Sequence, residues 1–120
     1  MAAGVSRPRY PRKDANHADI ESEFRARGFS VLDVSRLAGD RLDLVVGKWG
    51  ITTLVEIKDG DKVPSARKLK ESEQATFDTW LGRSPDLIEY VGDVAVLDHQ
   101  MRTESVAQSA GLGMAALSGR

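Results

Sequence analysis

The sequence predicts a single α/β domain built around a mixed sheet, and three observations support this prediction. The chain has 120 residues, which fits one ordinary domain. Hydrophobic residues make up 41% and charged residues 29% of it, proportions typical of a globular protein rather than a disordered one. Short β-prone runs alternate with helix-like segments in the order α-β-β-β-α-β.

The first half of the domain is expected to contain one helix and three strands. Asp14 or Asn16 is suited to start a helix over residues 16–27, in which Ile20 and Phe24 share one face and after which Gly28 follows. A short strand is predicted over 29–34, followed by a polar loop over 35–41. Residues 42–46 and 51–58 then form a predicted hairpin around a glycine-containing connection at 47–50.

The second half is expected to contain one long helix and one further strand. Ser65 is placed to start a helix that runs to about Leu81, where Gly82 closes it. Its inward-facing residues are predicted to be Leu69, Phe77, Trp80 and Leu81. Residues 84–91 fit either a helix start or a strand, residues 93–97 are predicted as a strand, and 103–111 as a weak helix.

Composition excludes several classes of protein. Cysteine is absent, which excludes a disulfide framework, thiol catalysis and thiolate-bound metal sites. No apolar run approaches the roughly 18 residues needed to cross a bilayer. The basic N-terminus is followed by no apolar core, so we expect no secretory signal, no membrane partner and a cytoplasmic location.

The net charge of −1 conceals an uneven distribution of basic residues. We expect residues 1–13 to form a flexible basic arm, residues 14–110 to form the domain, and residues 111–120 to be a frayed tail. Local basic clusters can hold a polyanion at one face of a nearly neutral protein. The candidate nucleic-acid-binding residues are Arg7, Arg9, Arg12 and Lys13 in the arm, and Lys62, Arg67, Lys68 and Lys70 after the hairpin.

Three charged residues in the hairpin form the candidate site. Glu56 and Lys58 are two apart on one strand and therefore project to the same face. If facing residue numbers in the hairpin sum to about 99, Asp43 lies opposite Glu56. Two carboxylates that face each other across strands repel. A divalent cation is the simplest group to offset this repulsion.

Oxygen ligands with open positions suit Mg²⁺ or Mn²⁺. Asp43 and Glu56 would bind the ion, and the backbone carbonyl of Ile57 offers a further oxygen. Lys58 would stabilise charge at a phosphate or hold the attacking water. This arrangement supports metal-assisted hydrolysis of a phosphodiester.

The segments Leu42-Asp43-Leu44 and Val55-Glu56-Ile57-Lys58 resemble the PD-(D/E)xK nuclease signature. Over roughly residues 14–97 the chain is similar to small VRR-NUC-like and Holliday-junction-resolvase-like nucleases, including short phage-borne ones. The resemblance implies a restriction-endonuclease-like αβββαβ core, a Mg²⁺ or Mn²⁺ cofactor and hydrolysis of DNA, with a preference for junctions or branches as one option. By analogy with resolvases it also implies a homodimer.

The resemblance also assigns individual residues. Asp43 and Glu56 match the metal-binding acids, Lys58 the catalytic lysine, and Gln74 a glutamine on the helix after the active strands. The proline usual before the first acid is replaced by Leu42. Resolvases carry a glutamate on the leading helix, where this chain has Asn16 or His17, so that Asp19, Glu21 or Glu23 would have to serve instead.

Simpler readings compete with each of these assignments. Glu56 and Lys58 can form an ion pair on an exposed strand, and Asp19 can complete a capping arrangement with Asn16. Gln74 can be an ordinary amide on a helix surface, and His17 and His99 are expected at the surface or in local structure. The whole chain can be a nucleic-acid-binding module that keeps the fold without turnover, or a structural protein in which the motif is coincidental.

Overall fold

The computed structural model describes residues 14–37 and 42–117, of which 112–117 are described by their backbone only. In chain order the elements are α1 (His17–Ala26), β1 (Ser30–Asp33), β2 (Leu44–Lys48), β3 (Ile51–Ile57), the short 3₁₀ helix η2 (Pro64–Arg67), α2 (Glu71–Thr79), β4 (Asp86–Ile88) and α3 (Val91–Leu117). The strands form one sheet in the order β1-β2-β3-β4. Strands β1 to β3 are antiparallel, and β4 runs parallel to β3. The predicted α/β class with a mixed sheet is confirmed.

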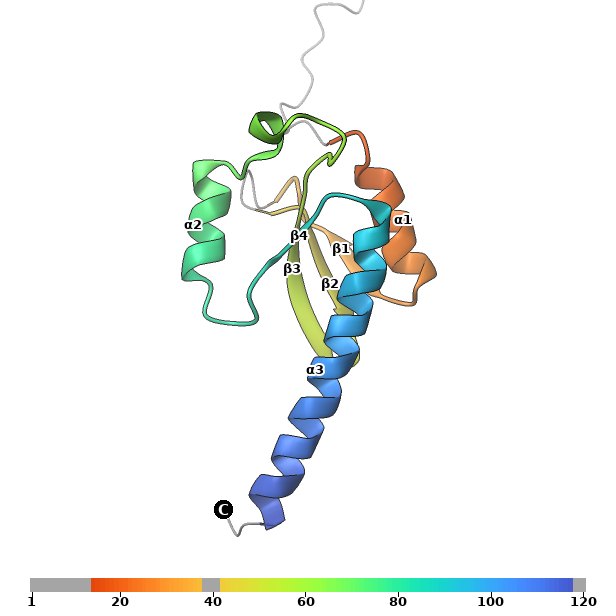
Figure 1. The fold of residues 1–120 in the computed structure, drawn as a ribbon, viewed down its shortest axis with the longest axis vertical. Helices are drawn as coiled ribbons and strands as arrows, with labels where there is room; N and C mark the ends of the chain where they lie inside the picture. Colours follow the sequence, from red (N-terminus) through yellow and green to blue (C-terminus); the bar gives the residue numbers. More distant parts are fainter. Residues whose placement is uncertain (1–13, 38–41, 118–120) are drawn as a thin grey trace, which may run out of the picture.

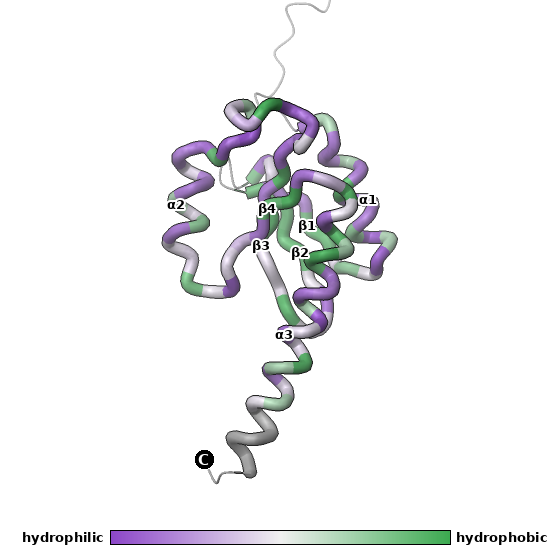
Figure 2. Tube along the Cα trace, viewed as in Figure 1, coloured by the Kyte–Doolittle hydropathy of each residue, from purple (hydrophilic) through white to green (hydrophobic). Residues whose placement is uncertain are grey.

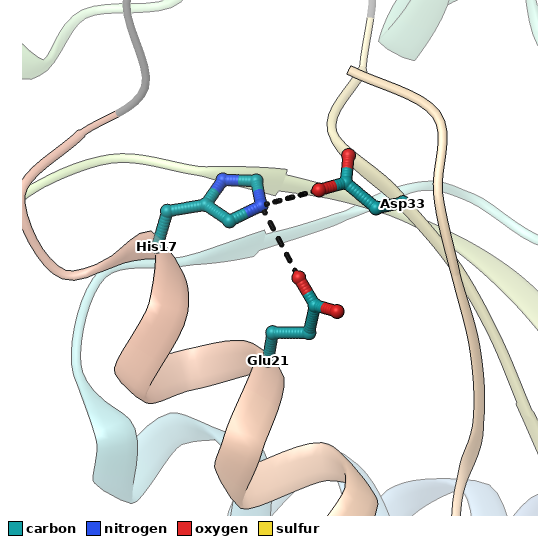
Figure 3. A group of neighbouring side chains, drawn as sticks. All are labelled: His17, Glu21 and Asp33. Atoms are coloured by element: carbon teal, nitrogen blue, oxygen red, sulfur yellow. Dashed lines mark ion pairs between the residues drawn. The ribbon is translucent and has the colours of Figure 1, made fainter. Parts of the chain in front are cut away.

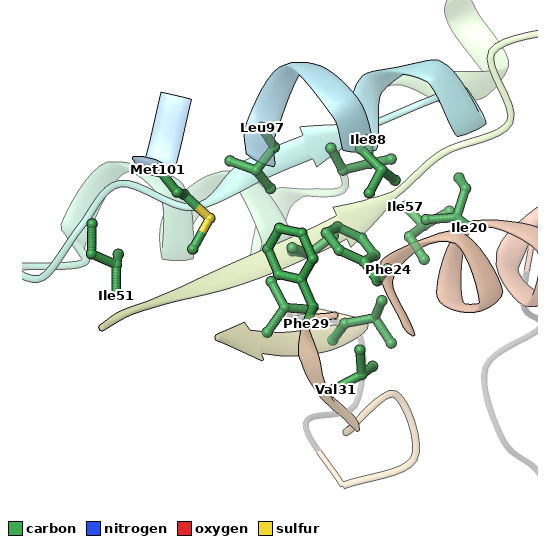
Figure 4. Close-up of a cluster of buried hydrophobic side chains, with 13 residues drawn as sticks. Ile20, Phe24, Phe29, Val31, Ile51, Ile57, Ile88, Leu97 and Met101 are labelled. Carbon is green, nitrogen blue, oxygen red and sulfur yellow. The ribbon is translucent and has the colours of Figure 1, made fainter. Parts of the chain in front are cut away.

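The helices are distributed over both faces of the sheet. α1 and α3 contact each other and the strands on one face, whereas α2 lies on the other side of the sheet (Figure 1). The core fills the space between the sheet and the helices α1 and α3 (Figure 4). Its most deeply buried side chains are Ile20, Phe24, Leu44, Val46, Val55, Ile57, Val94, Leu97 and Met101.

The leading helix forms as the sequence predicts. Ile20 and Phe24 are fully buried, and the ring of Phe24 packs edge to face against Phe29 with 4.9 Å between centroids. Gly28 has φ +85°, the left-handed conformation in which glycine avoids the steric cost of a side chain. Asn16 is the residue before the first helical turn, but its side chain makes no cap. It donates instead to the carbonyls of Lys58 and Glu89, so the predicted capping arrangement with Asp19 is wrong.

The hairpin has the predicted register but a tighter turn. Leu44 pairs with Val55 and Lys48 with Ile51, so facing residue numbers sum to 99. The turn consists of Trp49 and Gly50 alone, with φ values of 61° and 75°. Positive φ at both central residues is the type I′ geometry that matches strand twist. The indole Nε1 of Trp49 donates to Asp98 on α3 at 2.7 Å, which holds this uncommon conformation.

The predicted helix from Ser65 to Leu81 is wrong in its extent. The chain forms η2, becomes extended at Lys68 and Lys70, and only then begins α2 at Glu71. Arg67 is the last residue of η2, and its guanidinium donates hydrogen bonds to the Lys62 carbonyl and the Glu89 carboxylate. The apolar residues predicted to face inward do not form a core, since Leu81 is fully exposed, Trp80 is half-exposed, and Leu69 and Phe77 are only partly buried.

The predicted strand at 93–97 is also wrong, because these residues lie in α3. Val94, Leu97 and Met101 have helical spacing and are buried against the sheet, while Val96 points away with 57% exposure. The last strand is β4, within the segment that the sequence left ambiguous. The backbone remains helical through Leu117, past residue 110 where the domain was expected to end.

Hydropathy follows this arrangement along the trace. Hydrophobic residues concentrate in the strands, whereas α2 and the loops around it are mostly hydrophilic (Figure 2). Among the described helices, including the long α3, none combines the length and apolar character needed to span a membrane.

Candidate active site at one end of the sheet

The hairpin register brings Asp43 and Glu56 into contact. Asp43 comes directly before β2, and its backbone N–H donates to the Val55 carbonyl at 3.0 Å, one residue out of the register of the paired strands. Its carboxylate Oδ2 accepts the backbone N–H of Ile57 at 2.8 Å. The Asp43 carboxylate also lies close enough to the Glu56 carboxyl group to affect the pKa of Glu56. The two acids therefore share one face at one end of the sheet.

Lys58 and Glu73 complete this group of four side chains, which we call the acid–lysine cluster: Asp43, Glu56, Lys58 and Glu73. The ammonium of Lys58 lies 2.8 Å from Glu73 Oε1 and 3.8 Å from Glu56 Oε1. The same oxygen of Glu73 accepts the backbone N–H of Lys70 at 2.7 Å, which fixes the carboxylate at the start of α2. Glu56, Lys58 and Glu73 are all buried, at 3, 7 and 3% exposure.

Sequence reasoning did not identify Glu73. It lies in the first turn of α2, where its carboxylate accepts the backbone N–H of the preceding Lys70. With the helix predicted to begin at Ser65, Glu73 would lie mid-helix and would have no reason to point at the strands. Its assignment depends on the break between η2 and α2.

The pKa values of Glu56 and Glu73 are shifted in opposite directions. Desolvation, a hydrogen bond with Glu73 and the negative charge of Asp43 raise the pKa of Glu56 well above neutral. Burial alone would also raise the pKa of Glu73, but hydrogen bonds from Glu56, Lys58 and the Lys70 backbone lower it. Burial disfavours the charge of Lys58, yet its contacts with Glu73 and Glu56 outweigh this and raise its pKa. Without a cation, Glu56 therefore holds a proton beside an ionised Glu73.

The donor set of the acid–lysine cluster fits a hard divalent cation. Oε2 of Glu56 is buried and accepts no hydrogen bond, so one carboxyl oxygen is available as a ligand once the group is ionised. The formal charges of three carboxylates and one ammonium sum to −2, which one divalent ion balances. Ile57 directs its N–H at Asp43, and the carbonyl of a strand residue points to the same neighbour as its N–H. The Ile57 carbonyl therefore also faces this end of the sheet.

The remaining predicted site residues lie elsewhere. Gln74 is exposed and its side-chain amide donates to Asp78 one turn later, which is the ordinary surface arrangement of a helix. Asp19 is exposed on α1, the helix on the opposite face of the sheet from Glu73. The structure thus brings Glu73, rather than Asp19 or Gln74, to Asp43, Glu56 and Lys58.

The predicted basic residues are only partly placed. Arg7, Arg9, Arg12 and Lys13 lie outside the described residues. Arg67 is engaged by Glu89 at 2.8 Å, and Lys62 is 3.5 Å from Asp14, so both already have acidic partners. Lys68 and Lys70 are exposed in the segment that leads into α2, next to the acid–lysine cluster.

Comparison of the chain with models of known protein families, with curated proteins and with solved structures gave no match.

Proposed function

We propose that this protein is a Mg²⁺- or Mn²⁺-dependent nuclease of the PD-(D/E)xK type that hydrolyses phosphodiester bonds in DNA. The observation that carries the proposal is the convergence of Asp43, Glu56 and Lys58 on one face at one end of the sheet. The order α1-β1-β2-β3-α2-β4 is the order expected of a restriction-endonuclease-like core. In this proposal α3 is an addition after that core.

Asp43 and Glu56 would hold the ion, with the Ile57 carbonyl and Glu73 as further oxygen donors. When bound, such an ion supplies an activated water and neutralises charge on the phosphate. Glu56 would serve as a ligand in its ionised form, so binding of an ion there would be coupled to loss of the Glu56 proton.

Lys58 would act at the phosphate. Its ammonium lies 2.8 Å from Glu73, which orients it and raises its pKa against the cost of burial. It would provide a compact positive charge for a non-bridging phosphate oxygen or for the attacking water. Lys68 and Lys70, exposed beside the cluster, would contact the DNA backbone.

Cleavage assays with matched variants test this proposal. The full chain is incubated with linear, supercoiled and four-way-junction DNA in the presence of Mg²⁺, Mn²⁺ or a chelator. Asp43→Asn, Glu56→Gln and Lys58→Met should each lower the cleavage rate by about 100-fold or more. Glu71→Gln, which neutralises an exposed acid in the same turn of α2 as Glu73, should cleave like the wild type.

Two results contradict the nuclease proposal. One is metal-dependent cleavage that survives Asp43→Asn and Glu56→Gln at the wild-type rate. The other is the absence of nicking with either metal in a protein that binds DNA with steep salt dependence, which would identify the binding module without turnover.

A further inference from the structure

His17, the first residue of α1, is a buried histidine. It lies in the first turn of α1 with 3% exposure, so of the two expected placements, at the surface or in local structure, the surface is excluded. Neither ring nitrogen has a hydrogen-bond partner. A buried polar group without a hydrogen bond is costly, so this imidazole needs a partner of another kind.

Two carboxylates point at one nitrogen of this ring. Nε2 of His17 lies 3.4 Å from Asp33 Oδ2 at the end of β1 and 3.6 Å from Glu21 Oε1 one turn along α1 (Figure 3). The three ligand atoms all lie within 4.8 Å of one another. Zinc bonds to nitrogen and carboxylate oxygen are about 2.0–2.2 Å, so ligand atoms in a tetrahedral site are about 3.4 Å apart.

Each carboxylate is oriented through its second oxygen. Arg25 donates to Glu21 Oε2 at 3.0 Å. The backbone N–H and the hydroxyl of Ser35 donate to Asp33 Oδ1 at 3.0 and 2.6 Å. These contacts hold Oε1 of Glu21 and Oδ2 of Asp33 toward the imidazole, as outer partners orient the ligands of metal sites.

This triad lies on the opposite face of the sheet from the acid–lysine cluster. Asp33 pairs with Leu44, whose side chain is in the core under α1 and α3. Asp43 is adjacent to Leu44 in the sequence and therefore projects to the other face, with Glu56. A ligand at the triad is thus separate from one at the proposed nuclease centre.

We propose that His17, Glu21 and Asp33 bind a divalent transition-metal ion, with Zn²⁺ as the best fit. One imidazole and two carboxylates are zinc ligands, whereas Mg²⁺ favours an octahedron of oxygen atoms with several waters. Glu21 and Asp33 retain 22 and 27% side-chain exposure, which leaves a route from solvent and room for a water ligand. The ion would join the first turn of α1 to the end of β1 and so stabilise the folded state.

The imidazole signals of the full chain provide a direct readout, because it contains two histidines and the other, His99, is exposed on α3. Zn²⁺ is titrated into metal-free protein carrying Asp43→Asn and Glu56→Gln, and the imidazole nitrogens are followed by long-range ¹H–¹⁵N spectra. The nitrogen signals of His17 should shift to saturation at one ion per chain while those of His99 stay in place. Millimolar Mg²⁺ should move neither.

Variants that retain His17 separate ligation from a mere ion pair. Glu21→Gln and Asp33→Asn should each weaken Zn²⁺ binding by about 100-fold or more, since even outer partners of metal sites contribute 10- to 100-fold. His99→Gln should bind Zn²⁺ like its parent. The proposal is overturned if the His17 signals do not move, if both histidines shift alike, or if neither carboxamide variant changes the affinity.

Discussion

Glu56 and Glu73 are buried side by side, and a single proton makes this arrangement tolerable. Two ionised carboxylates in this environment would repel strongly, so Glu56 keeps its proton while Lys58 and the Lys70 N–H stabilise the charge on Glu73. In the proposed nuclease a cation would take the place of that proton. The same residues therefore connect pH and stability, and a strongly raised pKa of this kind makes Glu56 a functional-site candidate.

At the residue scale, Glu56→Gln should change the pH dependence of stability in the absence of metal. The folded-state pKa of Glu56 is raised above its unfolded value of 4.5, so between these values the folded state binds more protons than the unfolded state. Stability contributed by Glu56 is therefore present at low pH and falls as pH rises, by about 1.4 kcal/mol per pH unit. Glutamine removes this fall.

Urea denaturation in chelator at pH 6, 7 and 8 measures this effect. Within that range the lowered pKa of Glu73 and the raised pKa of Lys58 leave both groups in the same charge state whether folded or unfolded. As pH rises from 6 to 8, the unfolding free energy of the wild type should therefore fall relative to that of Glu56→Gln. In Glu71→Gln the unfolding free energy should depend on pH as it does in the wild type. If it also does so in Glu56→Gln, the raised pKa of Glu56 is refuted.

At the element scale, the turn that ends α1 and the turn that joins β2 to β3 set the positions of the candidate-site residues. Gly28 lets the chain leave α1 and return as β1, and the two-residue turn at Trp49 and Gly50 sets the register that faces Asp43 with Glu56. A shift of one residue in that register would send one of the two acids to the opposite face. The extended break between η2 and α2 likewise positions Glu73, because it puts this residue in the first turn of α2.

Replacing Gly28 by alanine tests the first of these turns. At φ +85° a Cβ is strained although nothing lies nearer than Lys48 Cε at 4.0 Å, so Gly28→Ala should reduce the unfolding free energy by about 1 kcal/mol. Gly92→Ala is the matched control, since it lies in the first turn of α3 with open space around it and should be neutral or slightly stabilising. Thermal or urea unfolding measures both, and equal destabilisation of the two variants would contradict this account.

At the scale of the whole molecule, α3 has two halves with different roles. Its first half supplies Val94, Leu97 and Met101 to the core. Contacts of its middle with the rest of the domain include Glu104 with Arg83 at 2.8 Å and Ser105 with the Trp49 carbonyl at 2.7 Å. Beyond these residues the helix continues away from the sheet (Figure 1).

Two truncations on α3 measure this division. Met101→Ala removes a fully buried side chain and should reduce the unfolding free energy by about 2–5 kcal/mol. Val106→Ala removes a side chain that is 65% exposed and should change it by less than about 0.5 kcal/mol. Denaturant unfolding compares them, and a similar loss in both would show that the distal half of the helix is part of the folded core.

The sequence by itself determined the features that depend on local periodicity and turn chemistry. The α/β class, the leading helix with its closing Gly28, and the hairpin register all follow from residues that are neighbours along the chain. That register was enough to place Asp43 opposite Glu56, with Lys58 beside it.

Only the tertiary structure decided which element residues 93–97 form, where α2 begins, and which distant side chains meet. The run at 94–97 suits a strand by propensity, but packing of Val94, Leu97 and Met101 on the sheet makes it a helix. Glu73 reaches Lys58, and His17 reaches Asp33, across segments whose spacing carries no local signal. Such contacts are settled when separate elements bury their apolar faces together, because the free energy of that burial exceeds local preference.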